Sequence, residues 1–102
     1  MIHTLKIWPQ FYHPVAFGAK TFEVRNNDRA FQKGDTVILK EWDPTPNPDD
    51  PNKLPKGFTK SPPLRFEVGF IYVLSATEVV FSLIEPAEEP NEAEKDALKA
   101  ML

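Results

Sequence analysis

The residues best suited to chemistry are concentrated in one short segment, residues 18–29. Behind Gly18, its charged and polar members include Lys20, Thr21, Glu23, Arg25, Asn27, Asp28 and Arg29. Residues two apart on a strand lie on one face, so Glu23 and Arg25 can pair and still offer donors to a phosphate or a nucleobase edge. The ammonium group of Lys20 suits a phosphate or a carbonyl oxygen. The segment therefore predicts a geometry suited to recognition.

A purely structural role competes with this hypothesis. A Glu–Arg pair on a strand face often does no more than close a barrel or bridge to a turn. Asp28 and Asp35 stand where turns need short Asx side chains, which favours a structural role for both. For Arg29, a functional role is favoured over a structural one.

The two histidines predict no metal site. His3 alternates with Leu5 and Ile7, which indicates a partly buried, hydrogen-bonded ring, and His13 is expected at the surface. Histidines ten residues apart, without an acidic pair at metal spacing, do not make a ligand set. We expect neither a metal nor another cofactor.

Aromatic side chains make up 12% of the chain, and most must serve the core of so small a protein. Trp8, Tyr12 and Phe58 lie at a strand end or in a loop near the basic segment. They are the candidates for stacking on a base.

The candidate residues depend on a mainly β framework. Period-two alternation predicts five strands, over residues 3–8, 20–25, 36–42, 64–74 and 77–84. In the second strand, Phe22 and Val24 are predicted to face the core, opposite Thr21, Glu23 and Arg25. In the fourth, the inward set is either Phe66, Val68, Phe70 and Tyr72 or its alternate, with a kink at Gly69. The short link Ser75–Ala76 predicts an antiparallel hairpin.

Two helices complete the predicted elements. Helical spacing indicates a short helix over residues 10–17, with Pro14 acceptable in its first turn and Gly18 as its stop, and a weak helix in the tail beyond Asn91. We expect a mainly β (α+β) fold, a mixed antiparallel sheet of five or six strands that closes or nearly closes into a small barrel.

Seven of the 11 prolines fall between residues 44 and 63. Proline lacks an N–H and restricts the residue before it, so this stretch is predicted to be a stiff loop of about 15 to 20 residues. A functional lid and a tolerated insertion both remain open.

Composition limits the classes of function. With 102 residues, 12 basic and 15 acidic side chains and no cysteine, the chain is predicted to be one cytoplasmic domain over residues 1–87, followed by an acidic helix or tail over residues 88–102. Disulfides, cysteine nucleophiles and membrane-spanning runs are excluded. The net charge of −3 argues against binding driven by bulk charge, although residues 1–42 carry six Lys or Arg against four acids.

The motif resembles the ASCH domain (activating signal cointegrator homology) of the PUA-like superfamily, whose signature is Gly-X-Lys-X-X-Glu-X-Arg. It looks most like an uncharacterised bacterial and phage ASCH-like family that opens with His-X-Leu-Lys, here residues 3–6, and continues through Lys-Thr-Phe-Glu-X-Arg-X-Asn-Asp-Arg, here residues 20–29. The resemblance is strong over residues 3–42. It implies a PUA-like barrel that binds RNA, with site residues His3, Lys6, Lys20, Thr21, Glu23, Arg25, Asn27 and Arg29. We expect a monomer.

Three functions follow as hypotheses. The first is an RNA- or nucleotide-binding module for a single-stranded or modified nucleotide. The second is a hydrolase of the ASCH type, an N4-acylcytidine amidohydrolase or a ribonuclease, that uses Lys20 and Glu23; the family's threonine position holds Glu23 here, which leaves Thr21 a doubtful nucleophile. The third is a phage-type modulator that contacts a protein partner through the proline-rich loop over residues 43–63.

Overall fold

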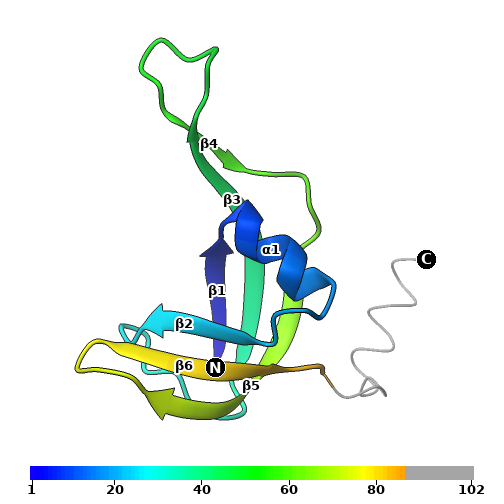
Figure 1. Cartoon of the computed structure of the whole chain (residues 1–102), viewed down its shortest axis with the longest axis vertical. Helices are drawn as coiled ribbons and strands as arrows, with labels where there is room; N and C mark the ends of the chain where they lie inside the picture. Colours follow the sequence, from blue (N-terminus) through cyan, green and yellow to red (C-terminus); the bar gives the residue numbers. More distant parts are fainter. Residues whose placement is uncertain (87–102) are drawn as a thin grey trace.

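Six strands and one short helix form the part of the chain that the computed structural model describes, residues 1–86. In chain order they are β1 (Ile2–Ile7), α1 (Pro9–Ala16), β2 (Phe22–Asn26), β3 (Thr36–Pro46), β4 (Pro55–Phe58), β5 (Leu64–Val73) and β6 (Glu78–Ile84) (Figure 1). The mainly β class is as predicted. The helix or tail predicted over residues 88–102 lies outside the described residues.

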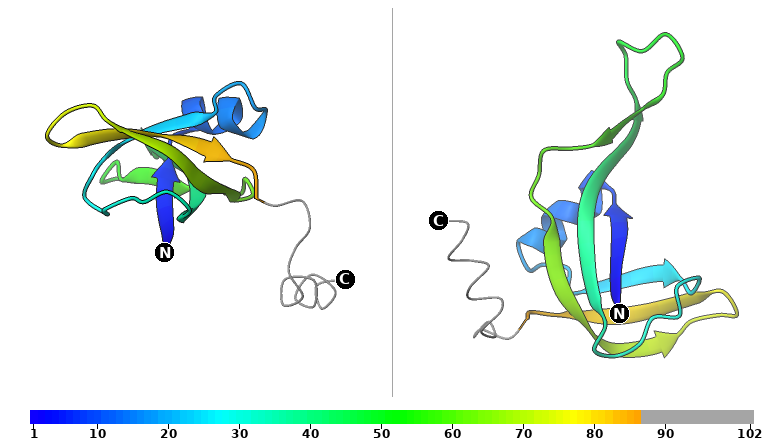
Figure 2. Two further views of the ribbon diagram at one scale, coloured as in Figure 1. Left: turned by 90° about the horizontal axis from the view of Figure 1, so that it is seen from below. Right: turned by 180° about the vertical axis from the view of Figure 1, so that it is seen from behind.

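The strands form one curled sheet that stays open. Its order is β1-β3-β5-β6-β2, with β4 paired to β3 beside this path; β1 runs parallel to β3 and the other pairs are antiparallel. The predicted closure into a barrel is wrong, because closure needs a ladder between β1 and β2. Instead, β2 runs across the direction of β1 (Figures 1 and 2). Both strands are therefore edges.

The core lies on the concave side of this sheet and is closed by α1. Its buried apolar side chains are Leu5, Ile7, Tyr12, Val15, Phe31, Val37, Leu39, Phe66, Val68, Val79, Phe81 and Leu83. The β5–β6 hairpin is antiparallel, as predicted from its short link.

Strand β2 turns the opposite face inward from the one predicted. Glu23 is 3% exposed, whereas Phe22 and Val24 are 46% and 45% exposed. The register explains the difference: Glu23 stands opposite Phe81 on β6, and directly opposed residues share a face of the sheet. Because Phe81 belongs to the core, Glu23 must point inward as well.

A register shift divides β5 into two halves. Phe66 and Val68 are buried, but the pairing with β6 shifts between Val68 and Ile71, so Phe70 and Tyr72 are exposed. The expectation that one alternating set faces inward along the whole strand is therefore wrong. The shifted segment includes Gly69, where the kink was predicted.

The proline-rich stretch is an arm rather than a loop alone. Strand β3 continues to Pro46 and pairs with β4, and residues 47–54 form the tip between them. The arm projects from the body of the sheet (Figure 1). Edge strands tolerate proline because one side of their backbone needs no partner.

Helix α1 begins at Pro9, where a missing N–H costs nothing, and contains Pro14 beyond its first turn, contrary to expectation. Gly18 follows with φ of +80° and redirects the chain toward β2. Among residues 1–86, no helix has the length and apolar character needed to cross a membrane.

Replacing Gly69 by alanine is expected to destabilise the fold by about 1 to 2 kcal/mol. An added Cβ would overlap Ser82 Oγ and lie 2.6 Å from Ile84 Cδ1, and Ser82 Oγ already accepts the Phe70 N–H at 2.8 Å. Urea unfolding of Gly69→Ala checks this against Lys33→Ala, a change at an exposed turn. Equal midpoints for both variants would contradict the close contact.

Candidate functional site

A buried carboxylate held by two cations forms the centre of the site. Lys20 Nζ donates to Glu23 Oε1 at 2.6 Å, and Arg25 donates to Glu23 Oε2 through Nε at 2.8 Å and Nη2 at 2.7 Å. Lys20 also donates to the Phe22 carbonyl at 2.7 Å. We call Lys20, Glu23 and Arg25 the Glu23 clasp. With two cations on one carboxylate, the clasp keeps a net positive charge at the edge of β2.

An apolar cavity of about 690 Å³ opens beside the clasp, and we call it the aromatic cavity. Its lining comprises Lys6, Ile7, Trp8, Phe11, Lys20, Phe22, Glu23, Val24 and Arg25. Lys20 Nζ lies 5.0 Å from the ring centroid of Phe22 and 5.6 Å from that of Phe11. The volume is in the range of small-molecule pockets. Aromatic walls with a cation beside them suit a flat, hydrogen-bonding ring.

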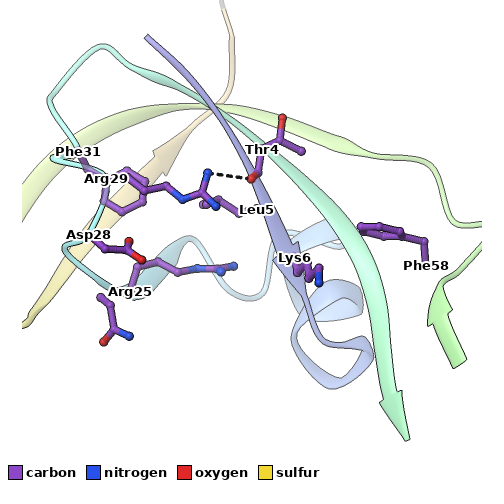
Figure 3. A pocket seen from close by; sticks show the side chains of 9 residues that line it. Thr4, Leu5, Lys6, Arg25, Asp28, Arg29, Phe31 and Phe58 are labelled. Atoms are coloured by element: carbon purple, nitrogen blue, oxygen red, sulfur yellow. Dashed lines mark hydrogen bonds between the residues drawn. The ribbon is translucent and has the colours of Figure 1, made fainter. Parts of the chain in front are cut away.

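A second cavity of about 440 Å³, the cationic cavity, adjoins the clasp at Arg25. Its lining comprises Thr4, Leu5, Lys6, Arg25, Asn26, Asp28, Arg29, Phe31 and Phe58 (Figure 3). Arg29 Nη1 donates to the Thr4 carbonyl at 3.2 Å and so connects the segment after β2 to β1. Because Lys6 and Arg25 line both cavities, we treat the two as one cleft at the open edge of the sheet.

Five of the predicted site residues come together in this cleft. They are Lys6, Lys20, Glu23, Arg25 and Arg29. The predicted Glu23–Arg25 pair is present, and it coexists with the cleft instead of replacing it. Glu23 and Arg25 therefore pair with each other and also line the cleft, so the structural and the functional hypotheses do not exclude one another.

His3, Thr21 and Asn27 do not join them. His3 is 4% exposed, and its Nε2 lies 2.8 Å from Asp35 Oδ2 with its ring against Phe31, so it serves the core. Thr21 and Asn27 are exposed and line neither cavity. The neighbours Asn26 and Asp28 line the cationic cavity in their place.

The three stacking candidates divide between the cavities and the core. Trp8 lines the aromatic cavity and Phe58 the cationic cavity, and both rings are largely exposed. Tyr12 is buried and donates its hydroxyl to the Pro62 carbonyl at 2.6 Å, so the expectation that it could stack on a base is wrong. Phe22 also lines the aromatic cavity, although it was predicted to face the core; its alternation with Glu23 was the available signal.

Glu41 is a third buried carboxylate, besides Glu23 and Asp35, and nothing in the sequence alone marked it as buried. Its Oε1 accepts the hydroxyls of Thr59 at 2.6 Å and Ser61 at 2.8 Å, which ties the returning end of the arm to β3. Its Oε2 is buried without a hydrogen bond among the described residues, and the nearest cation-forming group is His13 Nε2 at 3.6 Å. Within residues 1–86, no three His, Asp or Glu side chains converge as metal ligands would.

Comparison with known proteins gives a family and a phage relative. The model of a family described as "Domain of unknown function (DUF3850)" matches residues 2–79, which include the whole cleft. An uncharacterized 12.9 kDa protein in the GpA 3′ region of Escherichia phage P2 is 42% identical over 41 residues. That match covers 40% of this chain and 38% of the relative, so the chain spans well under half the length of the curated relative it matches.

The buried His3–Asp35 pair predicts acid sensitivity. The His3 hydrogen bond, aided by the Gln32 N–H and opposed by burial, lowers the pKa of Asp35 from 3.8 to about 2. A lowered folded-state pKa stabilises the fold above about pH 4, and this contribution of about 2 kcal/mol is lost as the pH falls toward 2. The difference in unfolding free energy between the wild type and Asp35→Asn should therefore shrink by that amount between pH 6 and pH 2.

Urea unfolding of both proteins across this pH range measures the difference. Asp49→Asn, at the exposed tip of the arm and outside both cavities, is the matched control for the loss of a carboxylate. A constant difference for Asp35→Asn would contradict the assignment.

Proposed function

The chain belongs to the DUF3850 family, and we propose that this member binds RNA or a nucleotide and holds a single-stranded or modified nucleotide in the cleft at the open edge of its sheet. One observation carries the proposal. An aromatic cavity and a cationic cavity share two walls, Lys6 and Arg25. A nucleotide has the same two parts, a flat base and an anionic phosphate, joined at a short distance.

The aromatic cavity supplies the contacts that a base needs. Trp8, Phe11 and Phe22 offer ring faces that stack on any nucleobase. Arg25 engages Glu23 through Nε and Nη2, and because a guanidinium carries five N–H donors, its Nη1 side remains to meet a base edge. The paired Glu23 fixes the orientation of that guanidinium, which lowers the cost of ordering it on binding.

The cationic cavity supplies the contacts that a phosphate needs. Lys6, Arg25 and Arg29 line it together with the single acid Asp28. This small number of cations fits recognition of one strand better than neutralisation of a duplex, which demands many phosphate contacts. The overall charge of −3 is compatible with such a local site.

The resemblance of residues 18–25 to the ASCH signature supports the same proposal. We propose on this basis that the family is related to the ASCH domains of the PUA-like superfamily. The open sheet then corresponds to a barrel whose last ladder, between β1 and β2, is replaced by the cleft.

Replacing Lys20 by methionine is expected to weaken RNA binding about tenfold at low salt, because a charge-assisted contact is lost while the apolar stem is kept. Fluorescence anisotropy with labelled single-stranded RNA octamers of several sequences measures the affinity. Thermal unfolding of the variant confirms that it is folded, because Lys20 also pairs with the buried Glu23.

Lys33→Met, an exposed lysine outside the cleft, is the matched control and should bind as the wild type does. Equal affinities for Lys20→Met and the wild type, or no binding of RNA by the wild type even at low salt, would contradict the proposal.

Hydrolysis is a second candidate, favoured by the 2.6 Å contact between Lys20 Nζ and Glu23 Oε1. A lysine and a carboxylate at this distance can exchange a proton and activate a water molecule. In an amidohydrolase, that water attacks the acyl carbon, the C–N bond breaks, and the proton passes to the departing cytidine amino group.

Release of cytidine from N4-acetylcytidine tests this candidate by chromatography. An amidohydrolase should show turnover in the wild type that Glu23→Gln removes, with Glu78→Gln, an exposed acid outside the cleft, as the control. Binding without turnover of acyl nucleosides or of RNA would leave the binding proposal and remove the enzymatic one.

A further inference from the structure

We propose that the base of the β3–β4 arm is a second nucleotide subsite, so that the ligand is a single strand of several nucleotides that passes from the cleft over Lys6 and stacks a base on Phe58. The inference rests on the proposed function and extends it. It gives the proline-rich arm a part in binding.

The first observation is the ring of Phe58. It stands on β4 directly opposite Trp42 on β3, is 57% exposed and lines the cationic cavity beside Lys6. An exposed ring at the end of a cation-lined cavity is suited to take the base that follows the bound phosphate. In Figure 3, Phe58 lies beyond Lys6 from Arg25 and Arg29, so it extends the site across β1 toward the arm.

The second observation is the pair of ammonium groups beside this ring. Lys6 and Lys40 are register partners on β1 and β3. Lys6 Nζ lies 5.8 Å from the Phe58 centroid and 4.4 Å from the Trp42 ring, and Lys40 Nζ lies 5.3 Å from the Phe58 centroid. A base stacked on Phe58 would thus have Lys6 and Lys40 near its two flanking phosphates, one cation for each.

The third observation is that hydrogen bonds to Glu41 hold the chain directly after Phe58 in place. The next residue, Thr59, donates its N–H to the Glu41 carbonyl at 3.1 Å and its hydroxyl to Glu41 Oε1 at 2.6 Å. Ser61 donates to the same carboxylate oxygen at 2.8 Å. Glu41 is therefore a positioning residue for the arm, and a ring carried on backbone that is already ordered loses less freedom on binding.

Charge sets the limits of this subsite. Asp49 and Asp50 lie at the arm tip, where they would repel a phosphate. Asp43 at the arm base is an anion as well, since Thr45 holds its pKa below the usual value, but its Oδ1 accepts the N–H and the hydroxyl of Thr45 and so turns toward that residue. The strand is therefore expected to cross the base of the arm and to leave the tip uncovered. A duplex keeps its bases stacked and offers none to Phe58.

The test compares a single-stranded RNA octamer with a nucleoside monophosphate on the full chain. The wild type should bind the octamer more tightly, and Phe58→Leu should lower the octamer affinity about tenfold and so narrow the ratio of the two affinities. Phe70→Leu, an exposed phenylalanine on β5 outside both cavities, is the matched control and should keep the wild-type ratio. Thermal unfolding of each variant confirms that it is folded.

A second readout uses salt. Lys40→Met should lower the slope of log K against log salt for the octamer by about 0.7, whereas Lys53→Met at the arm tip should leave it unchanged. An unchanged octamer-to-monophosphate ratio in Phe58→Leu, or a duplex bound as tightly as the single strand, overturns the arm subsite but leaves nucleotide binding in the cleft. Failure of the wild type to bind both ligands overturns the proposed function itself.

Discussion

The buried carboxylate of Glu23 is the constraint on which the site depends. Register with β6 forces this side chain toward the core, and an ionised carboxylate there is tolerable only when charged donors surround it. Lys20 and Arg25 supply those donors, and in doing so both cations are drawn to the inner edge of β2. The requirement to satisfy one buried charge thus concentrates positive charge where the sheet is open.

The open edge and the arm follow from the same arrangement of strands. Because β2 runs across β1, no ladder closes the sheet, and the space between them becomes the cleft whose walls include Lys6 and Arg25. On the other side of β1, strand β3 extends beyond its pairing with β1 and β5 and pairs with β4 to form the arm. Glu41 ties the arm back to the body, so Phe58 becomes part of the cleft wall.

The sequence predicted the class of fold, the strands of the body and the grouping of the motif. It could not tell which face of β2 points inward, because alternation of Phe22 and Val24 with Glu23 and Arg25 fits either orientation. The orientation is set by the pairing with β6, whose apolar residues face the core. It also missed the strands of the arm, since proline is compatible with edge strands that pattern alone cannot identify. His3 was predicted to be a site residue because of the family resemblance, but it pairs with Asp35 on the core side of the sheet.

The most direct test of the account is a titration of ¹⁵N-labelled protein with a single-stranded RNA octamer, followed by backbone and side-chain NMR shifts. Binding in the cleft and across the arm base predicts the largest changes at the Arg25 guanidinium, the Trp8 indole N–H and the amides around Lys6 and Phe58. Changes confined to the outer face of β5, around Phe70 and Tyr72, or an absence of changes at saturating RNA, would contradict it.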